Sequence, residues 1–230
     1  MNKTEVALPA PGRINCTQCH RGAPFDFDRT QTADAGWRIT NNPLAWGSQR
    51  PEVIVLGFSK GPTQAGALAS TPHDQIAFKG GRTNLAKILH HIGLLPSPDS
   101  RLVDQAIADP QGRFHFGSLI RCTVERQDPR KGWSGTGGGM LDRFVATSFG
   151  RTVLSACSSR FLGSLPSTTK VVVMLGMGSK GNYVSACRQA IAAARPGPWR
   201  TVNEVAYSDG QIMVVHTEHF AAQGALIPNW

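Results

Sequence analysis

The sequence predicts an α/β protein: a three-layer α/β/α sandwich around a central, mainly parallel four-stranded sheet, with a loop-rich N-terminal lobe. Two observations lead to this prediction. Apolar, β-branched runs alternate along the chain with segments of helical periodicity. Runs such as VIVLG (53–57) and VVVMLG (171–176) are apolar on both faces, which is typical of parallel strands covered by helices on each side. A length of 230 residues suits one domain, residues 1–230, with the lobe at residues 1–50.

The first half of the chain supplies two expected strands and one helix. Residues 1–50 are rich in Pro, Gly, Asn and Thr, which favours loops. A buried strand is expected at residues 51–57, where Gly closes an apolar run. Residues 81–95 place four aliphatic side chains at helical spacing and contain Gly93 as a stop signal. A second strand is expected at residues 113–124 (RFHFGSLIRCTV).

The second half continues the alternation. A helix is expected at residues 140–165, broken near Gly150, and a buried strand at residues 169–176. A further helix is expected at residues 178–194. Residues 201–217 contain SDG, a hairpin signal, followed by the last strand. Because parallel sheets bind ligands beyond the carboxyl ends of their strands, the segments that follow the strands are the candidates for a functional site.

The charge balance indicates a polyanionic partner. Lys and Arg outnumber Asp and Glu by 24 to 15, which gives a net charge of +9. Such a chain is attracted to nucleic acid, although no long basic run is present and the fold must assemble any basic surface. No apolar run approaches the length of a membrane span, and the N-terminus has no apolar signal-peptide core. We therefore expect a soluble cytoplasmic protein without a membrane partner.

Cysteine usage raises the question of a metal site. The number of cysteines, five, is odd, and a reducing compartment disfavours disulfides. Cys16 and Cys19 form a Cys-x2-Cys pair, Cys122 ends an expected strand, and Cys157 lies in an expected helix. Four such thiols can bind an iron–sulfur cluster or zinc, or they can be an incidental pair and two core residues. Cys187, in an Ala-rich helix, is expected to be a core residue.

Three loops after strands carry polar groups. GFSKGPTQ (57–64) can hold a phosphate on its backbone amides but lacks a P-loop ending, and a tight turn is the alternative. GMGSKG (176–181) opens a helix without the glycine spacing of a dinucleotide site. HTEHF (216–220) has two His and one Glu without zinc-protease spacing, so it offers a catalytic or DNA-contacting His, or structural loop residues.

Several segments then follow one another in a specific order. They are CTQC, VLGFSKG, AFKGGRTNLAKILHHIGL, FGSLIRC, ACSSRFLGSLPSTTKVVVMLG and VVHTEHF. In this order, and over nearly the whole chain, they resemble the uracil-DNA glycosylase superfamily, most closely its iron–sulfur branch, the family 4 enzymes. The resemblance implies a monomeric DNA glycosylase whose N-terminal lobe is an iron–sulfur lobe. It also implies a 4Fe–4S cluster held by four metal ligands, Cys16, Cys19, Cys122 and Cys157.

The chain departs from the resembled pattern at the positions that carry chemistry. The first motif of the family has an acidic residue or Asn, whereas this chain has Phe58, Ser59 and Lys60. The Asn that reads uracil is replaced by Ser118, which has one hydroxyl and no amide. Phe220 stands in place of a Pro, and the segment between the third and fourth Cys is longer than usual. Phe78 does match the aromatic residue that stacks on the flipped base.

These matches and departures give a set of expected roles. A glycosylase needs a flipped base, a grip on phosphates, and stabilisation of a cationic sugar and a departing base anion. The expected catalytic residues are His219, Ser59, Glu218 and Asp74. The expected base-binding residues are Phe58, Phe78 and Ser118. The expected DNA-binding residues are Lys60, Arg82, Arg121, Lys180 and His216.

Replacing the base-reading Asn by Ser118 removes the uracil code and enlarges the pocket. Some members of the resembled superfamily act on hypermodified viral bases. We therefore expect excision of a modified pyrimidine, such as glucosylated hydroxymethylcytosine in phage DNA, in antiviral defence. The alternatives are a catalytically silent iron–sulfur DNA-binding relative, a uracil repair glycosylase and a zinc-stabilised nucleic-acid binder.

Overall fold

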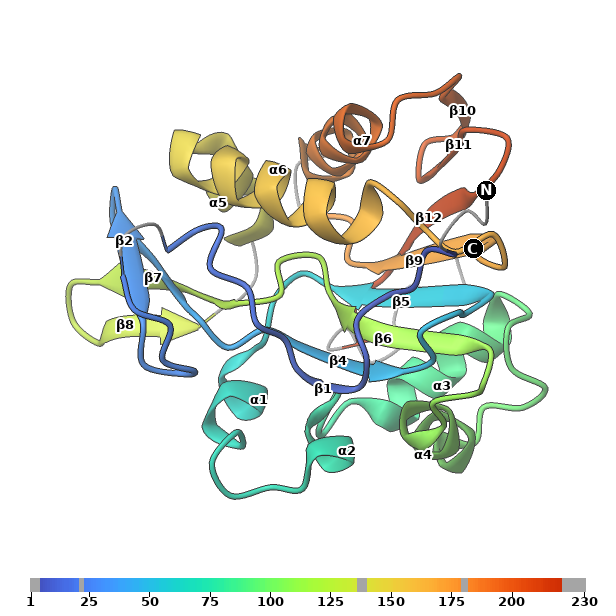
Figure 1. Cartoon of the computed structure of the whole chain (residues 1–230), viewed down its shortest axis with the longest axis horizontal. Helices are drawn as coiled ribbons and strands as arrows, with labels where there is room; N and C mark the ends of the chain where they lie inside the picture. The colour runs from blue at the N-terminus through green and yellow to red at the C-terminus, as the bar shows by residue number, and fades with distance from the viewer. Residues whose placement is uncertain (1–4, 21–22, 136–139, 179–181, 221–230) are drawn as a thin grey trace.

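Figure 1 shows the protein as a computed structural model, which describes residues 5–20, 23–135, 140–178 and 182–220. A large sheet crosses the middle of the molecule, with helices above and below it in this view, and a smaller sheet lies at one end. In the part of the chain described, no helix is both long and apolar enough to cross a membrane.

The large sheet has eight strands in the order β1-β4-β6-β5-β9-β12-β11-β10. Its middle strands, β6, β5, β9 and β12, pair in parallel, and the outer pairs are antiparallel. The bounds are β1 Gly12–Arg13, β4 Leu44–Gly47, β5 Val53–Gly57, β6 Phe114–Ser118, β9 Val171–Leu175, β10 Arg200–Asn203, β11 Ala206–Ser208 and β12 Met213–Thr217.

The small sheet has four antiparallel strands in the order β2-β3-β7-β8. Its bounds are β2 Gln31–Asp34, β3 Trp37–Thr40, β7 Thr123–Asp128 and β8 Gly132–Gly135. Ala35 and Gly36 join β2 to β3, and both have positive φ, which is the backbone that a two-residue hairpin turn requires.

The predicted fold class is therefore wrong. The protein has a mixed eight-stranded sheet and a separate antiparallel sheet, not one central, mainly parallel four-stranded sheet. The described part of residues 1–50 is rich in loops, as expected, and it also contributes two strands to each sheet. An edge strand such as β2, whose residues are largely exposed, lacks the apolar run that reveals a buried strand.

Helices cover both faces of the large sheet. In Figure 1, α5 Met140–Ala146, α6 Ser148–Leu162 and α7 Asn182–Ala194 lie on one side of it. The helices of the other side are α1 Pro62–Gly66, α2 His73–Ile76, α3 Arg82–His91 and α4 Ser100–Ala108. Alternate residues of β5 belong to different cores: Ile54 and Leu56 pack with α6, and Val53 and Val55 pack with α3.

Two segments that were each predicted as a single element contain two elements in the structure. The predicted strand 113–124 ends at Ser118, and the chain then turns and enters the small sheet as β7. The predicted helix 140–165 breaks at Thr147, whose side chain accepts a hydrogen bond from the Gly150 amide and caps α6. The hairpin predicted from SDG is present and joins β11 to β12.

Candidate functional site

The candidate site lies at the carboxyl edge of the parallel strands. Gly57 at the end of β5 pairs with Ser118 at the end of β6, and the Gly176 amide after β9 donates to the Thr217 carbonyl at the end of β12. The backbone also links the segments beyond the strands, because the Leu119 amide donates to the Gly57 carbonyl at 2.7 Å. Segments far apart in the sequence therefore meet where such sheets bind ligands.

Phe78 stands over the end of β5. A Cβ atom on Gly57 would lie 3.8 Å from the Phe78 ring. The ring packs edge-on against Phe116 at 6.0 Å and against Phe220 at 5.7 Å between centroids. Only 4% of Phe78 is exposed, so its neighbours, Phe116 and Phe220 among them, enclose the ring on which a base would stack. Its φ of 51° is unusual for a residue with a side chain and costs about 1–3 kcal/mol.

The two serines differ in their hydrogen bonding. The Ser59 hydroxyl is buried, and no hydrogen-bond partner for it exists among the residues that the structure describes. A buried, unpaired hydroxyl costs stability and is available to a ligand. Ser118 is the last residue of β6 and is 7% exposed. Phe58, expected to bind the base, packs edge-on against Phe144 and Tyr183 in the core.

The segment after β12 brings the His and Glu residues. Glu218 is 1% exposed, and His219 is half-buried with its ring 4.1 Å from that of Phe220. Burial lowers the pKa of His219 below its ordinary value, which favours a neutral imidazole at neutral pH. A neutral imidazole can donate one hydrogen bond and accept another. The Asn84 side chain holds this segment by donating to the Phe220 carbonyl at 3.1 Å.

His216, expected to contact DNA, is a core residue in this structure. Its exposure is 2%, Nδ1 donates to the Gly176 carbonyl at 3.2 Å, and Nε2 accepts from the Tyr207 hydroxyl at 3.3 Å. Burial lowers the pKa of His216 to about 4. The imidazole is therefore neutral and ties β9, β11 and β12 together.

Arg82 and Asp74 lie on the α3 and α2 side of this edge. The Arg82 guanidinium donates to the carbonyls of Asp74 and Ala77 and forms a salt bridge with Asp104 at 2.6 Å. Arg82 thus fastens α2 to the start of α3 rather than presenting a free cation to DNA. The Asp74 carboxylate is exposed on α2. Lys180, also expected to bind DNA, lies outside the described residues.

The four predicted cluster cysteines converge. The Cys19 and Cys157 thiols share a hydrogen bond, which, with burial, raises the pKa of Cys157 well above its ordinary value. Burial, with added repulsion from Cys157 and Cys16, raises the pKa of Cys122 to about 12. Cys187 lies in α7, outside this group of four, and its side chain forms a hydrogen bond with that of Tyr183. Yet within the described stretches no group of three or more His, Cys, Asp or Glu side chains is placed to hold a metal ion.

Two cations are buried beside these thiols. Lys60 and Arg121, expected to grip DNA phosphates, are each 2% exposed and do not present their charges at the surface. The Lys60 ammonium donates to the Arg121 carbonyl. The Arg121 guanidinium donates to the Leu44 carbonyl at 3.3 Å and contacts His115 at 3.3 Å. In the described part of the chain, neither cation takes part in a salt bridge, and the Arg121 Nε has no hydrogen-bond partner.

The position of these cations has a local cause. A Cβ atom on Gly117 would fall 1.8 Å from the Arg121 Nη1 atom, so the glycine makes room for the guanidinium. Burial, despite opposing attraction from Cys122, lowers the pKa of Lys60 to about 8. Burial also lowers the pKa of Arg121 to about 10. Asp28 attracts Lys60, but neither cation forms a salt bridge in the described residues. Two buried cations without a salt bridge are costly, which indicates that a negative group belongs next to them.

Comparison of the sequence with protein-family models and with curated proteins gives no match.

Proposed function

We propose that the chain is a DNA glycosylase that flips a modified base out of DNA and hydrolyses its N-glycosidic bond, which leaves an abasic site. The base in this proposal is a modified pyrimidine such as glucosylated hydroxymethylcytosine, and the setting is antiviral defence in the cytoplasm, by a monomer. One observation carries the proposal. The motifs that resemble the superfamily are spread from Gly57 to Phe220, yet they meet at one carboxyl edge of parallel strands.

The reaction needs few groups, and this edge offers them. The bond between the sugar C1′ and the base nitrogen breaks, its electron pair leaves with the base, and water adds to C1′ while a proton is released. His219 is suited to donate a hydrogen bond to the departing base, because its imidazole is neutral. The Glu218 carboxyl group, buried beside it, is suited to stabilise the cationic sugar. The Ser59 hydroxyl is available to the base or to the water.

Ser118 supports a base larger than uracil. It occupies the end of β6, where the resembled family places the Asn that reads uracil. Serine is smaller and cannot make the paired donor and acceptor contacts of an amide. A site built to bind one edge of a base rejects analogues strongly only when its polar groups are buried and matched. The exchange therefore relaxes selection for uracil and leaves space for a substituent.

We also propose a 4Fe–4S cluster on Cys16, Cys19, Cys122 and Cys157. Support comes from the convergence of the four thiols, although the thiols are not arranged as ligands. The two buried cations beside them fit a site that becomes negative when four thiolates bind. When bound, such a cluster would cross-link the N-terminal segment to the β6–β7 connection and to α6.

A catalytically silent DNA-binding relative is the second candidate, and one observation favours it. The residues after β5 supply no carboxylate: Phe58 is in the core and Lys60 is buried beside the thiols. In the resembled family an acid or Asn here positions the attacking water. A chain that retains the scaffold without this group would bind DNA and leave its bases in place.

Abasic-site formation on a substrate panel tests the proposal. The panel contains uracil DNA, unmodified DNA, and phage DNA with hydroxymethylated or glucosylated cytosine, and alkali cleavage is the readout. The variants are His219→Ala and, as a matched control, His91→Ala at the exposed end of α3. We expect cleavage of modified DNA only, lost in His219→Ala and kept in His91→Ala. Equal cleavage of uracil DNA would refute the proposed substrate, and binding without cleavage would establish the silent relative.

Metal analysis tests the cluster separately. We expect a brown protein with iron and sulfide after anaerobic purification, and loss of both in Cys157→Ala. Cys187→Ala is the matched control, because Cys187 is also a buried helical thiol but lies outside the group of four. A colourless protein that contains zinc, or iron retained in Cys157→Ala, would exclude the proposed cluster.

A further inference from the structure

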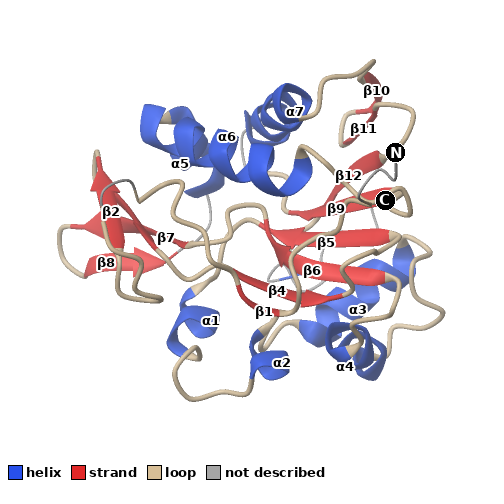
Figure 2. Ribbon diagram, viewed as in Figure 1, coloured by secondary structure: helices blue, strands red, loops and turns tan. Residues whose placement is uncertain are grey.

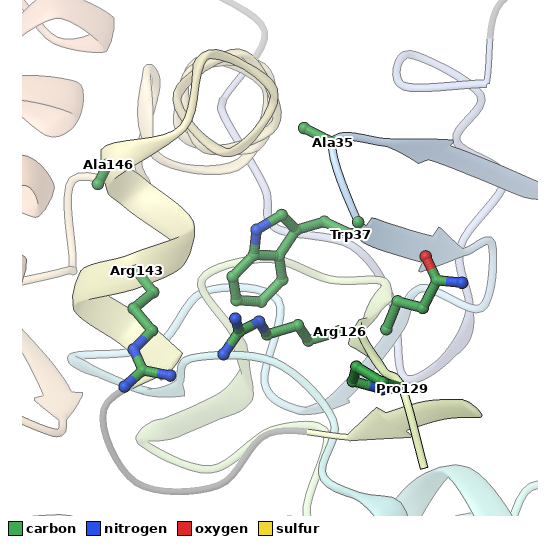
Figure 3. Close-up of a pocket in the computed structure, with 8 residues that line it drawn as sticks. Ala35, Trp37, Arg126, Pro129, Arg143 and Ala146 are labelled. Carbon is green, nitrogen blue, oxygen red and sulfur yellow. The ribbon is translucent and has the colours of Figure 1, made fainter. Parts of the chain in front are cut away.

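A hollow with two arginines lies between the small sheet and α5, and we call it the arginine hollow. Its volume is about 590 Å³, and the residues that matter here are Trp37 on β3, Arg126 on β7 and Arg143 on α5. Figure 3 shows the Arg126 guanidinium reaching beneath the Trp37 indole, with the Arg143 guanidinium on the same side of the indole. The Arg126 guanidinium carbon is 5.9 Å from the centre of the Trp37 ring.

The positive charge of the two guanidinium groups is only partly balanced by nearby carboxylates. Both arginines are exposed, and no salt bridge of either is found in the described part of the chain. The carboxylates next to them in the sequence have other partners: Glu125 forms a salt bridge with Arg38, and Asp142 accepts from the Tyr183 amide. Asp128 attracts Arg126, but its carboxylate accepts hydrogen bonds from the amides of Arg130 and Lys131 and closes the β7–β8 turn. The exposed side chains of Arg130 and Lys131 add two more cations to that turn.

The packing of Trp37 keeps the floor of the hollow fixed. The indole is 4% exposed and packs edge-on against Phe144 of α5 at 5.1 Å between centroids. Because Arg126 lies against this ring, its guanidinium already has restricted freedom. It therefore loses less conformational entropy when it binds a ligand than a free surface side chain would. Guanidinium groups bind phosphate oxygens with two parallel hydrogen bonds, so a pair of them favours a phosphate-rich ligand over a neutral one.

The arginine hollow is also close to the candidate site along the chain. Ser118 ends β6 at the carboxyl edge, and Arg126 follows eight residues later on β7. Eight extended residues span at most about 29 Å. B-DNA rises 3.4 Å per base pair. The distance between the candidate site and the arginine hollow is therefore at most about nine base pairs, which one bound duplex can span. Figure 1 shows the small sheet beyond the end at which β6 passes into β7.

We infer that the arginine hollow binds the phosphodiester backbone of the DNA whose base enters the site at the carboxyl edge. This inference rests on the proposed function, because it supplies the phosphate grip that Lys60, Arg121 and His216 cannot provide from the core. Arg126 and Arg143 take one phosphate each. They position the DNA and do not read its sequence.

Salt-dependent DNA binding tests the inference. The wild type is compared with Arg126→Gln/Arg143→Gln, with Arg126→Lys/Arg143→Lys, and with the control Lys170→Gln/Arg200→Gln. The control pair removes the same charge from exposed positions before β9 and at the start of β10. The logarithm of the affinity falls linearly with the logarithm of the salt concentration, and the magnitude of this slope decreases by about 0.9 for each phosphate contact that is lost. We expect the Gln pair to lose about 1.8, and the Lys pair and the control to keep the wild-type slope.

The outcomes separate this inference from the proposed function. A wild type that binds DNA, with equal slopes in the Gln pair and the control pair, overturns the arginine hollow alone. A wild type that binds no DNA overturns both. Inorganic phosphate at matched ionic strength is the further arm: we expect it to displace DNA from the wild type more readily than from the Gln pair, and equal displacement from both would show that the hollow holds no DNA phosphate and would overturn the inference. Thermal unfolding of each variant checks that the fold is intact.

Discussion

His216 gives a pH dependence of stability that can be calculated from the structure. Its pKa is lowered from 6.5 to about 4, and burial is the main cause. Below pH 6.5 the unfolded chain binds a proton at this position and the folded chain does not, so stability falls as the pH is lowered toward 4. The full loss is about 3.4 kcal/mol at 1.36 kcal/mol per pKa unit, of which about 2.5 kcal/mol is lost between pH 7.5 and 4.5.

The variant His216→Gln isolates this contribution. Gln keeps one donor for the Gly176 carbonyl and one acceptor for the Tyr207 hydroxyl, but it does not titrate. Tyr207 and Tyr183 stay protonated in this range, since burial raises the pKa of both. Urea unfolding at pH 7.5, 5.5 and 4.5 measures the difference. We expect the His216→Gln variant to be less stable than the wild type by about 1 kcal/mol at pH 7.5 and more stable than it at pH 4.5, because only the wild type loses stability through this histidine. Parallel pH profiles for the two proteins would refute the reasoning.

Two further predictions concern the backbone. Gly47→Ala should cost at least about 2 kcal/mol, because φ is +74° and the new Cβ would lie 2.4 Å from the Phe114 carbonyl oxygen. Gly210→Ala, with φ of +88° and open space around it, is the control, and equal losses in urea unfolding would show that the contact is unimportant. Asp99→Ala should lower the midpoint of thermal unfolding, because the Asp99 side chain accepts from the Arg101 amide and caps α4. Thermal unfolding measures it, and an unchanged midpoint would contradict it.

The sequence predicts buried strands well because their signal is local. Residues 53–57 and 171–175 are apolar at every position, and both are central parallel strands. The small sheet has no such signal. Gln31–Asp34 is polar and exposed, and the strand after Cys122 is contiguous with an apolar run that belongs to the other sheet. Only the turn at residues 119–122 separates them, and its backbone pairing with the β5–α1 segment is a tertiary feature.

For the site residues too, the sequence predicts what depends on local signals and not what depends on tertiary packing. Charge and strand-end position predict that Lys60, Arg121 and His216 face DNA, but each is buried. The burial of these cations depends on three-dimensional packing: Lys60 lies beside thiols from distant parts of the chain, and Gly117, four residues before Arg121, makes room for its guanidinium. The arginine hollow was missed for the opposite reason. Arg126 and Arg143 are ordinary exposed arginines in sequence, and only the packing of β7 against α5 brings them together.

Backbone strain at Phe78 connects the fold to the proposed reaction. A phenylalanine with φ of 51° is held there by the surrounding structure, at a cost that favours a functional reason over a packing reason. Its ring is covered by Phe220, which is itself seated against Gly81 and held by Asn84. A flipped base can stack on Phe78 only if Phe220 moves, and Phe220 adjoins His219. In the proposed reaction, a movement of the segment after β12 would therefore do two things: it would let the base reach Phe78, and it would set the position of His219.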